Sequence, residues 1–297
     1  MPCYNPITGY RTANGEVVFT ELKRYGDTTQ ITVKCGQCIG CKLERSRIWA
    51  MRCVHEASMY KRNCFITLTY DDEHMPERGR LTYPDFQAFL KRLRKHAEPQ
   101  NVRFYMGGEY GSLNDRPHYH AILFNWDWDD KQYFKTTGSG EKIYTSERLQ
   151  QLWPYGYSST AAMTFESAAY IARYCLQKIT GDDAEEHYKR FDYLGEYQLV
   201  PEFNEMSVKP GIGADWLHFR KNDVYTYDRV IINGKETNVP AYYDKLLKRQ
   251  DPEKMRDFKE EREWRGYQNR ADNTTERLKV KEQVTQAKLK QLHRGNI

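Results

Sequence analysis

Apolar residues follow regular patterns through the first two thirds of the chain. The run Cys64–Tyr70 is rich in β-branched and aromatic side chains and predicts a buried strand. In residues 83–96 the apolar positions recur every three or four residues among basic ones, which predicts an amphipathic helix. Val102–Tyr105 predicts a second strand that leads into Glu109, and Pro117–Phe124 predicts a third. The connection between these two strands is short enough for a hairpin.

Further patterns extend this arrangement toward the C-terminus. A hairpin is expected where two apolar runs, 224–232 and 236–239, flank Asn233-Gly234. Together the elements predict an α+β fold: an antiparallel sheet with helices packed on one face and a functional site on the other. The other expected elements are helices at about 43–61, 145–152 and 166–179 and a strand at 155–165.

Both ends of the chain differ in composition from its middle. Residues 1–41 are rich in Gly and turns, and we expect them to fold only around a metal. From residue 252 onward the chain is dense in charge, which predicts an exposed helix or a partly disordered tail. We therefore expect four segments: a Cys-rich segment with a helix (1–62), a core (63–182), an accessory segment with a hairpin (183–250) and a charged tail (251–297).

Composition narrows the functional classes. The chain has 297 residues, of which 39% are hydrophobic and 14% aromatic, so it can bury a sizeable core. Its net charge of +5 permits nucleic-acid binding without establishing it, because local clustering matters more than the sum. No apolar run approaches the roughly 20 residues of a membrane helix. The N-terminus also lacks the basic-then-apolar order of a signal peptide, so we expect a cytosolic protein without a membrane partner.

Seven cysteines in a cytosolic chain argue against a disulfide framework. Cys35, Cys38 and Cys41 form a C-x2-C-x2-C run with glycines between them, a tight knuckle that can grip a soft metal. A closed zinc site needs a fourth ligand, and Cys3 is the candidate. An iron–sulfur cluster and free thiols are the alternatives, although the Cys-Pro signature of bacterial ferredoxins is absent.

His118 and His120 carry the strongest functional signal. Alternate residues of a strand point to the same face about 7 Å apart, so the two imidazoles can close on one divalent metal. Hairpin pairing would bring Glu109 opposite this face, whereas the rival carboxylate, Asp115, lies in the loop. The plain alternative is a solvated sheet face that binds nothing.

Two imidazoles and one carboxylate would leave metal positions open for a phosphate oxygen and water, as in a catalytic site. The expected ion is Mg²⁺ or Mn²⁺, with the nitrogen ligands favouring Mn²⁺ or softer ions. The same ligands could hold Fe²⁺ in an oxygenase, although those sites usually carry His-x-Asp/Glu on one strand.

Tyr170 and Tyr174 are four residues apart in a predicted helix, so both phenols lie on one face, with Lys178 one turn further. The alternative is a buried aromatic stripe, but Ile171 and Leu176 already supply a separate apolar face. A phenol near a divalent ion can act as a nucleophile toward phosphate. Lys178 could stabilise the charge that develops or could be a solvated lysine.

In their order along the chain, these motifs resemble those of HUH endonucleases, the rolling-circle replication initiators. They look most similar to the initiators of gokushovirus-like microviruses, which are small single-stranded-DNA bacteriophages. The resemblance covers roughly residues 1–215. It is carried by Phe65–Tyr70, Gly108–Gly111, Arg116–His120, the Tyr170/Tyr174 helix, the Cys3 and Cys35/Cys38/Cys41 pattern, and Pro210–Gly213.

The resemblance implies that residues 63–182 form an HUH endonuclease core of ferredoxin-like type. It further implies a site-specific nick at the origin of a phage genome in the host cytoplasm, covalent attachment of the protein to the 5′ end, and later rejoining. Implied partners are the single-stranded or nicked viral origin and the host replication helicase and polymerase. The rival class is a non-catalytic DNA- or RNA-binding protein that recognises its target through the cysteine knuckle and an aromatic sheet.

Overall fold

The computed structural model describes residues 3–20, 26–111, 114–178 and 183–294, without the side chains of residues 173–177, 183 and 292–294. The chain divides into two compact units, residues 46–252 and residues 1–45 together with 253–297. The first and last of the four segments expected from the sequence both contribute to the smaller unit. The two middle segments lie in the larger unit.

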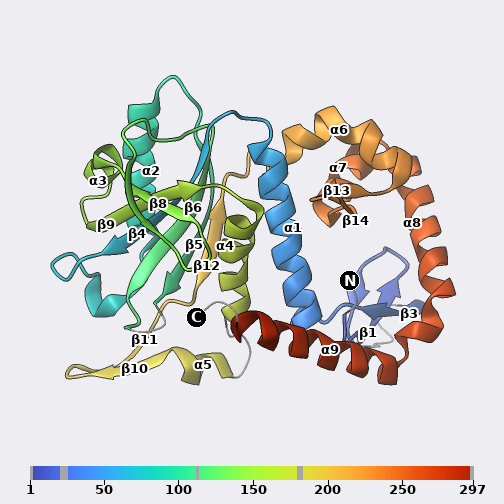
Figure 1. The fold of residues 1–297 in the computed structure, drawn as a ribbon. Coiled ribbons are helices and arrows are strands. Elements are labelled where there is room, and N and C mark those ends of the chain that lie inside the picture. The colour runs from blue at the N-terminus through green and yellow to red at the C-terminus, as the bar shows by residue number, and fades with distance from the viewer. Residues whose placement is uncertain (1–2, 21–25, 112–113, 179–182, 295–297) are drawn as a thin grey trace. The chain divides into compact units, whose positions relative to one another are not determined.

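The larger unit is built around an antiparallel sheet (Figure 1). Its central strands bear the motifs that the sequence singles out, and its two edges come from segments where no strand is expected. In spatial order the described strands are β12 (Phe203–Met206), β5 (Arg103–Tyr110), β6 (Pro117–Phe124), β4 (Asn63–Tyr70), β9 (Gly156–Ala162), β8 (Lys142–Thr145) and β7 (Gln132–Thr136).

Helices cover both faces of this sheet, so the expectation of helices on one face only is wrong. On one face, α2 (Tyr83–Ala97) and α3 (Glu147–Leu152) pack against Leu68 and Tyr119. On the other face, α1 (Ile39–Ala57) and α4 (Phe165–Gln177) pack against residues such as Ile122. Figure 1 shows the sheet between these two sets of helices. The second layer exists because α4 has its own apolar stripe, which must be buried.

Side-chain alternation in β6 decides where the histidines point. Tyr119, Ala121 and Leu123 belong to the core on the α2 face, whereas Ile122 belongs to the core on the α4 face. His118 and His120 have the parity of Ile122 and therefore share the face that α4 covers. The expected hairpin between β5 and β6 is confirmed, with Glu109 paired to His118.

The other elements of the larger unit lie between the strands of the central sheet or after its last strand in sequence. The hairpin at Asn233-Gly234 is confirmed, and both turn residues have positive φ, as a tight turn requires. The strand expected from residue 224 is wrong, because Val224 and Tyr225 are buried on α6. The elements are η2 (Glu77–Gly79), α5 (Asp183–Tyr188), β10 (Lys189–Asp192), β11 (Gly195–Gln198), α6 (Ala214–Tyr227), β13 (Val230–Ile232), β14 (Lys235–Thr237) and α7 (Ala241–Gln250).

The smaller unit joins the two ends of the chain. Its sheet has the order β2-β1-β3, in a segment that the sequence predicts only as turns. The charged tail forms helices, and Leu278 is buried against the cysteines of the N-terminal segment. The elements are β1 (Ile7–Thr12), β2 (Val17–Val18), β3 (Thr28–Val33), the start of α1, α8 (Pro252–Gln268), η3 (Arg270–Asn273) and α9 (Thr275–Arg294).

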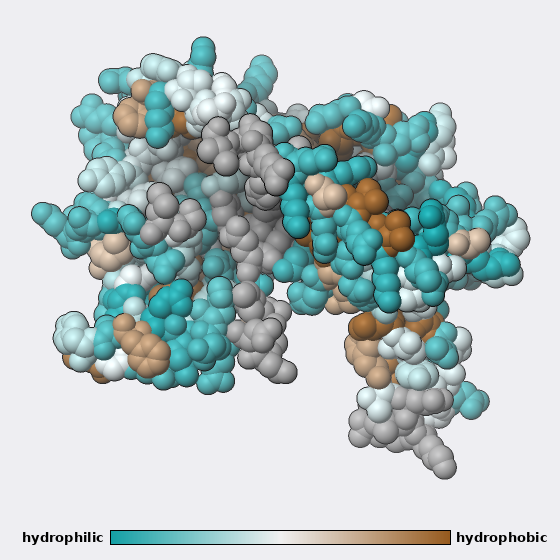
Figure 2. Space-filling view, turned by 60° about the horizontal axis from the view of Figure 1, so that its bottom comes forward, coloured by the Kyte–Doolittle hydropathy of each residue, from teal (hydrophilic) through white to brown (hydrophobic). Residues whose placement is uncertain are grey.

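The face of the molecule drawn in Figure 2 is predominantly polar. Figure 2 shows one face of the molecule, on which hydrophilic side chains prevail and hydrophobic ones form separate patches. Among the helices of the described ranges, each is too short or too polar to span a bilayer.

Candidate metal centre and tyrosine helix

Glu109, His118 and His120 meet on the α4 face of the sheet. Glu109 Oε1 lies 2.6 Å from His118 Nε2 and 2.8 Å from His120 Nε2. Glu109 and His120 are only 3% and 7% exposed, and His118 is half-buried. The rival carboxylate, Asp115, lies in the β5–β6 turn and faces Arg190 at 3.4 Å. The hairpin thus selects Glu109 as the carboxylate of this cluster.

The other ring nitrogen of each histidine has its own partner. His118 Nδ1 lies 3.0 Å from the backbone oxygen of Arg116, to which it donates its hydrogen. His120 Nδ1 lies 3.0 Å from the Thr67 hydroxyl on the neighbouring strand β4. Such outer contacts fix ring orientation and leave Nε2 as the inward-facing atom, the arrangement common around metal-binding histidines. Phe65 stacks on the His120 ring at 5.4 Å and shields it.

On each imidazole, burial lowers the pKa and Glu109 raises it, and the net shift differs between the two histidines. Burial disfavours the charged form of His118, but the hydrogen bond and charge of Glu109 outweigh it and raise the pKa of His118. For His120, burial dominates and lowers the pKa despite the same carboxylate, and the charge of His118 adds to this effect. His120 is therefore neutral at physiological pH, the form that ligates a metal.

The three side chains fit a divalent ion. Their ligand atoms all lie within 4.8 Å of one another. The second carboxylate oxygen of Glu109, Oε2, is buried and accepts no hydrogen bond from any described residue. A buried carboxylate oxygen without a donor is costly unless a cation is nearby. The cluster is therefore a candidate site for one cation with two nitrogen donors and at least one oxygen donor.

The start and seating of α4 position its tyrosines. Thr164 and Ser167 form a reciprocal capping box that fixes the first turn. Ile171 packs over Gly107 of β5, where any added Cβ would lie 3.1 Å from the Ile171 side chain. Gly107 in turn pairs with His120 across the β5–β6 ladder. The glycine thus lets the helix approach the sheet directly beside the histidine.

Tyr170 lies against the metal cluster. Its ring centroid is 5.1 Å from that of His120, in an edge-to-face arrangement, and 6.5 Å from that of Phe65. It is 37% exposed, so the ring is accessible from solvent as well as packed beside the imidazole. A phenol in this position is neither a core residue nor a remote surface residue.

The other two residues expected on this face are less fully described. The backbone of Tyr174 belongs to α4, but its side chain lies outside the described residues. Lys178 is half-buried and is the C-cap that follows the last helical residue. The expectation that it lies on the helical face of the tyrosines is therefore wrong. The helix ends one turn after Tyr174.

The four cysteines expected to form a knuckle come together in the smaller unit. The Sγ atom of Cys3 lies 3.5 Å from that of Cys35 and 3.9 Å from that of Cys38. The four sulfurs, with that of Cys41, lie within 4.8 Å of one another. Backbone N–H groups of Tyr4, Cys35 and Cys38 donate to these sulfurs at 3.2–3.3 Å.

Two thiols of the cysteine cluster, those of Cys38 and Cys41, have pKa values shifted in opposite directions. Burial works against ionisation of Cys38, but backbone donors from Cys41, Tyr4 and Asn5 outweigh it and lower its pKa to about 6. Burial raises the pKa of Cys41 to about 12. One thiolate is therefore favoured while a neighbouring thiol resists ionisation. A bound cation would supply the charge that deprotonates the whole set.

Sequence patterns did not indicate several residues that complete these sites. Thr67 lies in the predicted strand Cys64–Tyr70 and has the same parity as Phe65, so alternation would have placed it beside the histidines. Gly107 belongs to a Gly-Gly pair directly before Glu109, a signal of close backbone approach in a strand. Strand β12, which flanks β5, has no such signal, because its four residues alternate only weakly.

Comparison with known proteins gives a consistent picture. The family described as replication-associated protein ORF2/G2P matches residues 63–179. Replication-associated protein VP4 of Bdellovibrio phage phiMH2K is 32% identical over 87% of this chain and 81% of its own length. Replication-associated protein ORF2 of Spiroplasma virus 4 is also 32% identical, over 89% and 86%. ORF4 of Chlamydia phage 1 is 26% identical, over 77% and 57%. Among solved structures no match was found.

Proposed function

From the premise that this chain belongs to the replication-associated proteins of phages, the initiators of rolling-circle replication, we propose that it is a site-specific single-stranded-DNA endonuclease and strand-joining transesterase. The observation that carries this proposal is the ring of Tyr170, 5.1 Å from the ring of His120, beside a carboxylate–histidine cluster suited to a cation. A nucleophile next to a metal site provides both an attacking group and stabilisation of the charge that develops in phosphodiester transfer.

In this proposal Glu109, His118 and His120 hold Mg²⁺ or Mn²⁺. When bound, such an ion polarises the scissile phosphate and neutralises charge that develops on it. The phenol oxygen of Tyr170 or Tyr174 attacks phosphorus, so that an O–P bond forms and the bond to the 3′ oxygen breaks. The phenol proton passes to solvent and the 3′ oxygen takes up a proton. The products are a 5′-phosphotyrosine and a free 3′-hydroxyl.

A phenol has a usual pKa of about 10 and needs help to lose its proton at neutral pH. We assign that help to the ammonium group of Lys178, the C-cap residue of the helix that bears both tyrosines. Two tyrosines would let one hold a DNA end while the other attacks a second junction. The 3′-hydroxyl released at that second junction then attacks the first phosphotyrosine. A 3′–5′ phosphodiester forms, the tyrosine–phosphate bond breaks, the phenol regains a proton, and the circle closes.

The proposed partners follow from this reaction. The substrate is the viral-strand origin of a phage genome, single-stranded or locally melted, in the host cytoplasm. The free 3′-hydroxyl is a primer terminus, so a host polymerase can extend it while a host helicase unwinds the parental duplex.

For the cysteine cluster we propose a structural Zn²⁺ held by Cys3, Cys35, Cys38 and Cys41. The Sγ separations of 3.5 and 3.9 Å lie around the edge of about 3.8 Å expected for a tetrahedron with metal–sulfur bonds of about 2.3 Å. An iron–sulfur cluster would have to fit several atoms between the same sulfurs and force them further apart. All four cysteines lie within the residues that the structure describes, and none of them forms a disulfide.

The experiment that tests the nuclease is covalent capture. The protein is incubated with viral-strand oligonucleotides and Mn²⁺, and DNA–protein adducts are sought on a denaturing gel and by mass. The variant Y170F/Y174F should form no adduct, whereas Y157F, which alters a 70% exposed tyrosine on β9, should react normally. An adduct in the double variant would remove this tyrosine pair. Salt-dependent binding without any adduct would favour the non-catalytic nucleic-acid-binding protein instead.

A further inference from the structure

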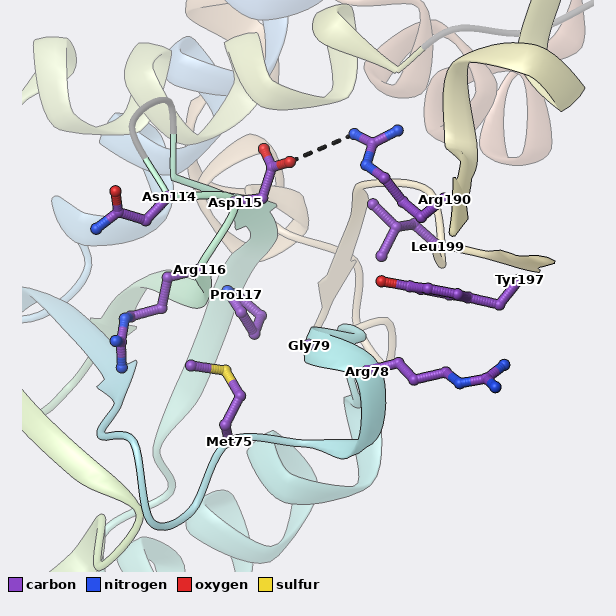
Figure 3. A pocket seen from close by; sticks show the side chains of 10 residues that line it. All are labelled: Met75, Arg78, Gly79, Asn114, Asp115, Arg116, Pro117, Arg190, Tyr197 and Leu199. Atoms are coloured by element: carbon purple, nitrogen blue, oxygen red, sulfur yellow. Dashed lines mark hydrogen bonds and ion pairs between the residues drawn. The ribbon is translucent and has the colours of Figure 1, made fainter. Parts of the chain in front are cut away.

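A cavity of about 270 Å³ opens at the end of the sheet where β6 begins. Its walls come from the β4–α2 connection, the residues just before β6, and the β10–β11 hairpin with the residue that follows it (Figure 3). Pro117 lines it, whereas the next residue, His118, points to the opposite face of the sheet. The cavity is therefore separate from the cluster of Glu109, His118 and His120 but is only one residue away along the chain.

The cavity combines apolar walls and a tyrosine hydroxyl with arginine residues. Met75, Pro117 and Leu199 supply apolar surface, and the hydroxyl end of Tyr197 points into the space between them (Figure 3). The guanidinium of Arg78 lies 4.9 Å from the centroid of the Tyr197 ring, which holds that ring in place.

The charge of the lining favours an anion. Three arginines, Arg78, Arg116 and Arg190, line the cavity together with one acidic residue, Asp115. The side chains of Arg78 and Arg116 extend outward from it, whereas that of Arg190 extends toward Asp115 (Figure 3). Arg190 faces Asp115 at 3.4 Å, and both side chains are substantially exposed, so this pair contributes little and can open. Arginine presents several donors in a planar fork that suits phosphate oxygens. Arg78 and Arg116 also have carboxylate partners outside the lining, Asp192 and Asp72.

The hairpin beside the cavity presents unusual surface residues. Arg190 and Tyr197 are cross-strand partners, which puts both side chains on the hairpin face toward the cavity. On the rest of the hairpin, Phe191 and Tyr193 are 72% and 95% exposed. Aromatic rings that extend into solvent beside arginines are the usual stacking platform for unpaired bases.

A direct contact connects the cavity to the metal cluster. The backbone oxygen of Arg116 accepts the hydrogen bond from His118 Nδ1, and its side chain donates to the backbone oxygen of Tyr70 at 2.8 Å. A DNA strand in the cavity therefore contacts Arg116, the residue whose backbone oxygen orients the imidazole of His118.

Building on the proposed function, we propose that this cavity is a binding subsite for one unpaired nucleotide of the single-stranded DNA that leads to the metal cluster. The base packs on the apolar wall beside the hydroxyl of Tyr197, and Arg190 binds its phosphate. Tyr193, in the turn of the hairpin, stacks on a base that follows along the same DNA strand.

The test measures binding without chemistry. A fluorescein-labelled oligothymidylate is titrated with the full chain in buffer to which no Mg²⁺ or Mn²⁺ is added, and fluorescence anisotropy gives its affinity. R190Q, Y197L and Y193A should each weaken binding at least about fivefold, while affinity for a duplex of the same length changes less. The matched control is Y133L, which alters a 61% exposed tyrosine in the β7–β8 hairpin at the far edge of the sheet and should bind like wild type.

Two outcomes would overturn the subsite: affinities of all three variants within about twofold of wild type, or an equal loss in Y133L. Unchanged melting curves ensure that a loss reflects binding rather than unfolding. Failure of the subsite remains distinct from failure of the nuclease. If only the subsite is wrong, these variants bind and form adducts normally. If only the nuclease is wrong, wild type binds and the variants lose affinity, but no adduct forms.

Discussion

Glu109 and His118 lie opposite each other in the β5–β6 ladder, and their side chains meet at 2.6 Å on the sheet face that α4 covers. The contact brings a buried carboxylate to two imidazoles whose other nitrogens already have partners. Because Glu109 Oε2 has no donor among the described residues, the carboxylate is arranged for a cation rather than for the hydrogen bonds of a folded core.

Replacing Glu109 with Gln should therefore remove the charged ligand while keeping the size of the side chain. We expect Mn²⁺ affinity, measured by calorimetric titration, to fall at least about 10-fold, since even loss of an outer-shell partner costs 10- to 100-fold. Adduct formation should fall with it. E141Q, on the exposed β7–β8 turn, is the control and should bind Mn²⁺ like wild type. Equal Mn²⁺ binding by E109Q would show that the ion is held elsewhere.

Thr67 offers a test of how the imidazole is held. Its hydroxyl contacts His120 Nδ1 at 3.0 Å, so T67V should leave the fold intact but free the ring to rotate. We expect Mn²⁺ affinity to drop by about 10- to 100-fold. T67S retains the hydroxyl and should recover most of that loss. If T67V and T67S bind Mn²⁺ equally well, the contact does not orient the ring.

His55 predicts how stability depends on pH. It is buried, stacks on Trp216 with 3.5 Å between ring centroids, and hydrogen-bonds to Tyr243. Burial lowers its pKa to about 3. Between that value and about 6.5, the unfolded chain binds a proton that the folded chain does not. This contribution to stability is thus complete above pH 6.5 and is lost as the pH falls, by about 1.4 kcal/mol per pH unit.

Urea midpoints at pH 7.5 and 5.5, followed by circular dichroism, test this expectation. H55Q lowers stability at both values but should show a smaller decrease between them, because it has no imidazole to protonate. H218Q, which alters an exposed histidine on α6, should retain the wild-type decrease. The same pH dependence in H55Q as in wild type would contradict the assignment.

The cysteine centre should reveal its ion by spectroscopy. Cobalt added to chelator-treated protein should give the thiolate-to-metal absorption of a tetrahedral site, and zinc should displace it. C38S should lose most of the bound zinc, and α9 should then become sensitive to protease, since Leu278 is buried against the cysteines. C64S, which alters a cysteine of the central sheet, should keep its zinc. A metal-free protein with protected α9 would refute the proposal.

The sequence predicts the central sheet well because its strands satisfy strong local rules. Strand β6 has the predicted bounds, and β4 alternates between buried and half-buried residues along its whole length. The hairpin register then follows, and with it the meeting of Glu109 and His118. All three residues of the candidate metal site thus lie on two adjacent strands.

Features set by long-range packing were not predictable in the same way. Strand β12 is short and owes its place to pairing with β5, and β1 with β3 forms a sheet from polar residues such as Thr29 and Gln30. Val224 and Tyr225 resemble a strand in isolation, but burial together with Leu217 makes them helical. In each case tertiary contacts outweigh local propensity.

The arrangement of the smaller unit has a consequence for how the protein is made. Tyr4 hydrogen-bonds to Thr285 on α9, and Leu278 of the same helix packs with the four clustered cysteines. On the ribosome, the segments that build the central sheet of the larger unit emerge before α9 and can assemble during translation. The N-terminal cysteines are covered only after α9 has been synthesised, so a chain that stops before residue 275 would carry the central sheet with cysteines that lack the cover of Leu278.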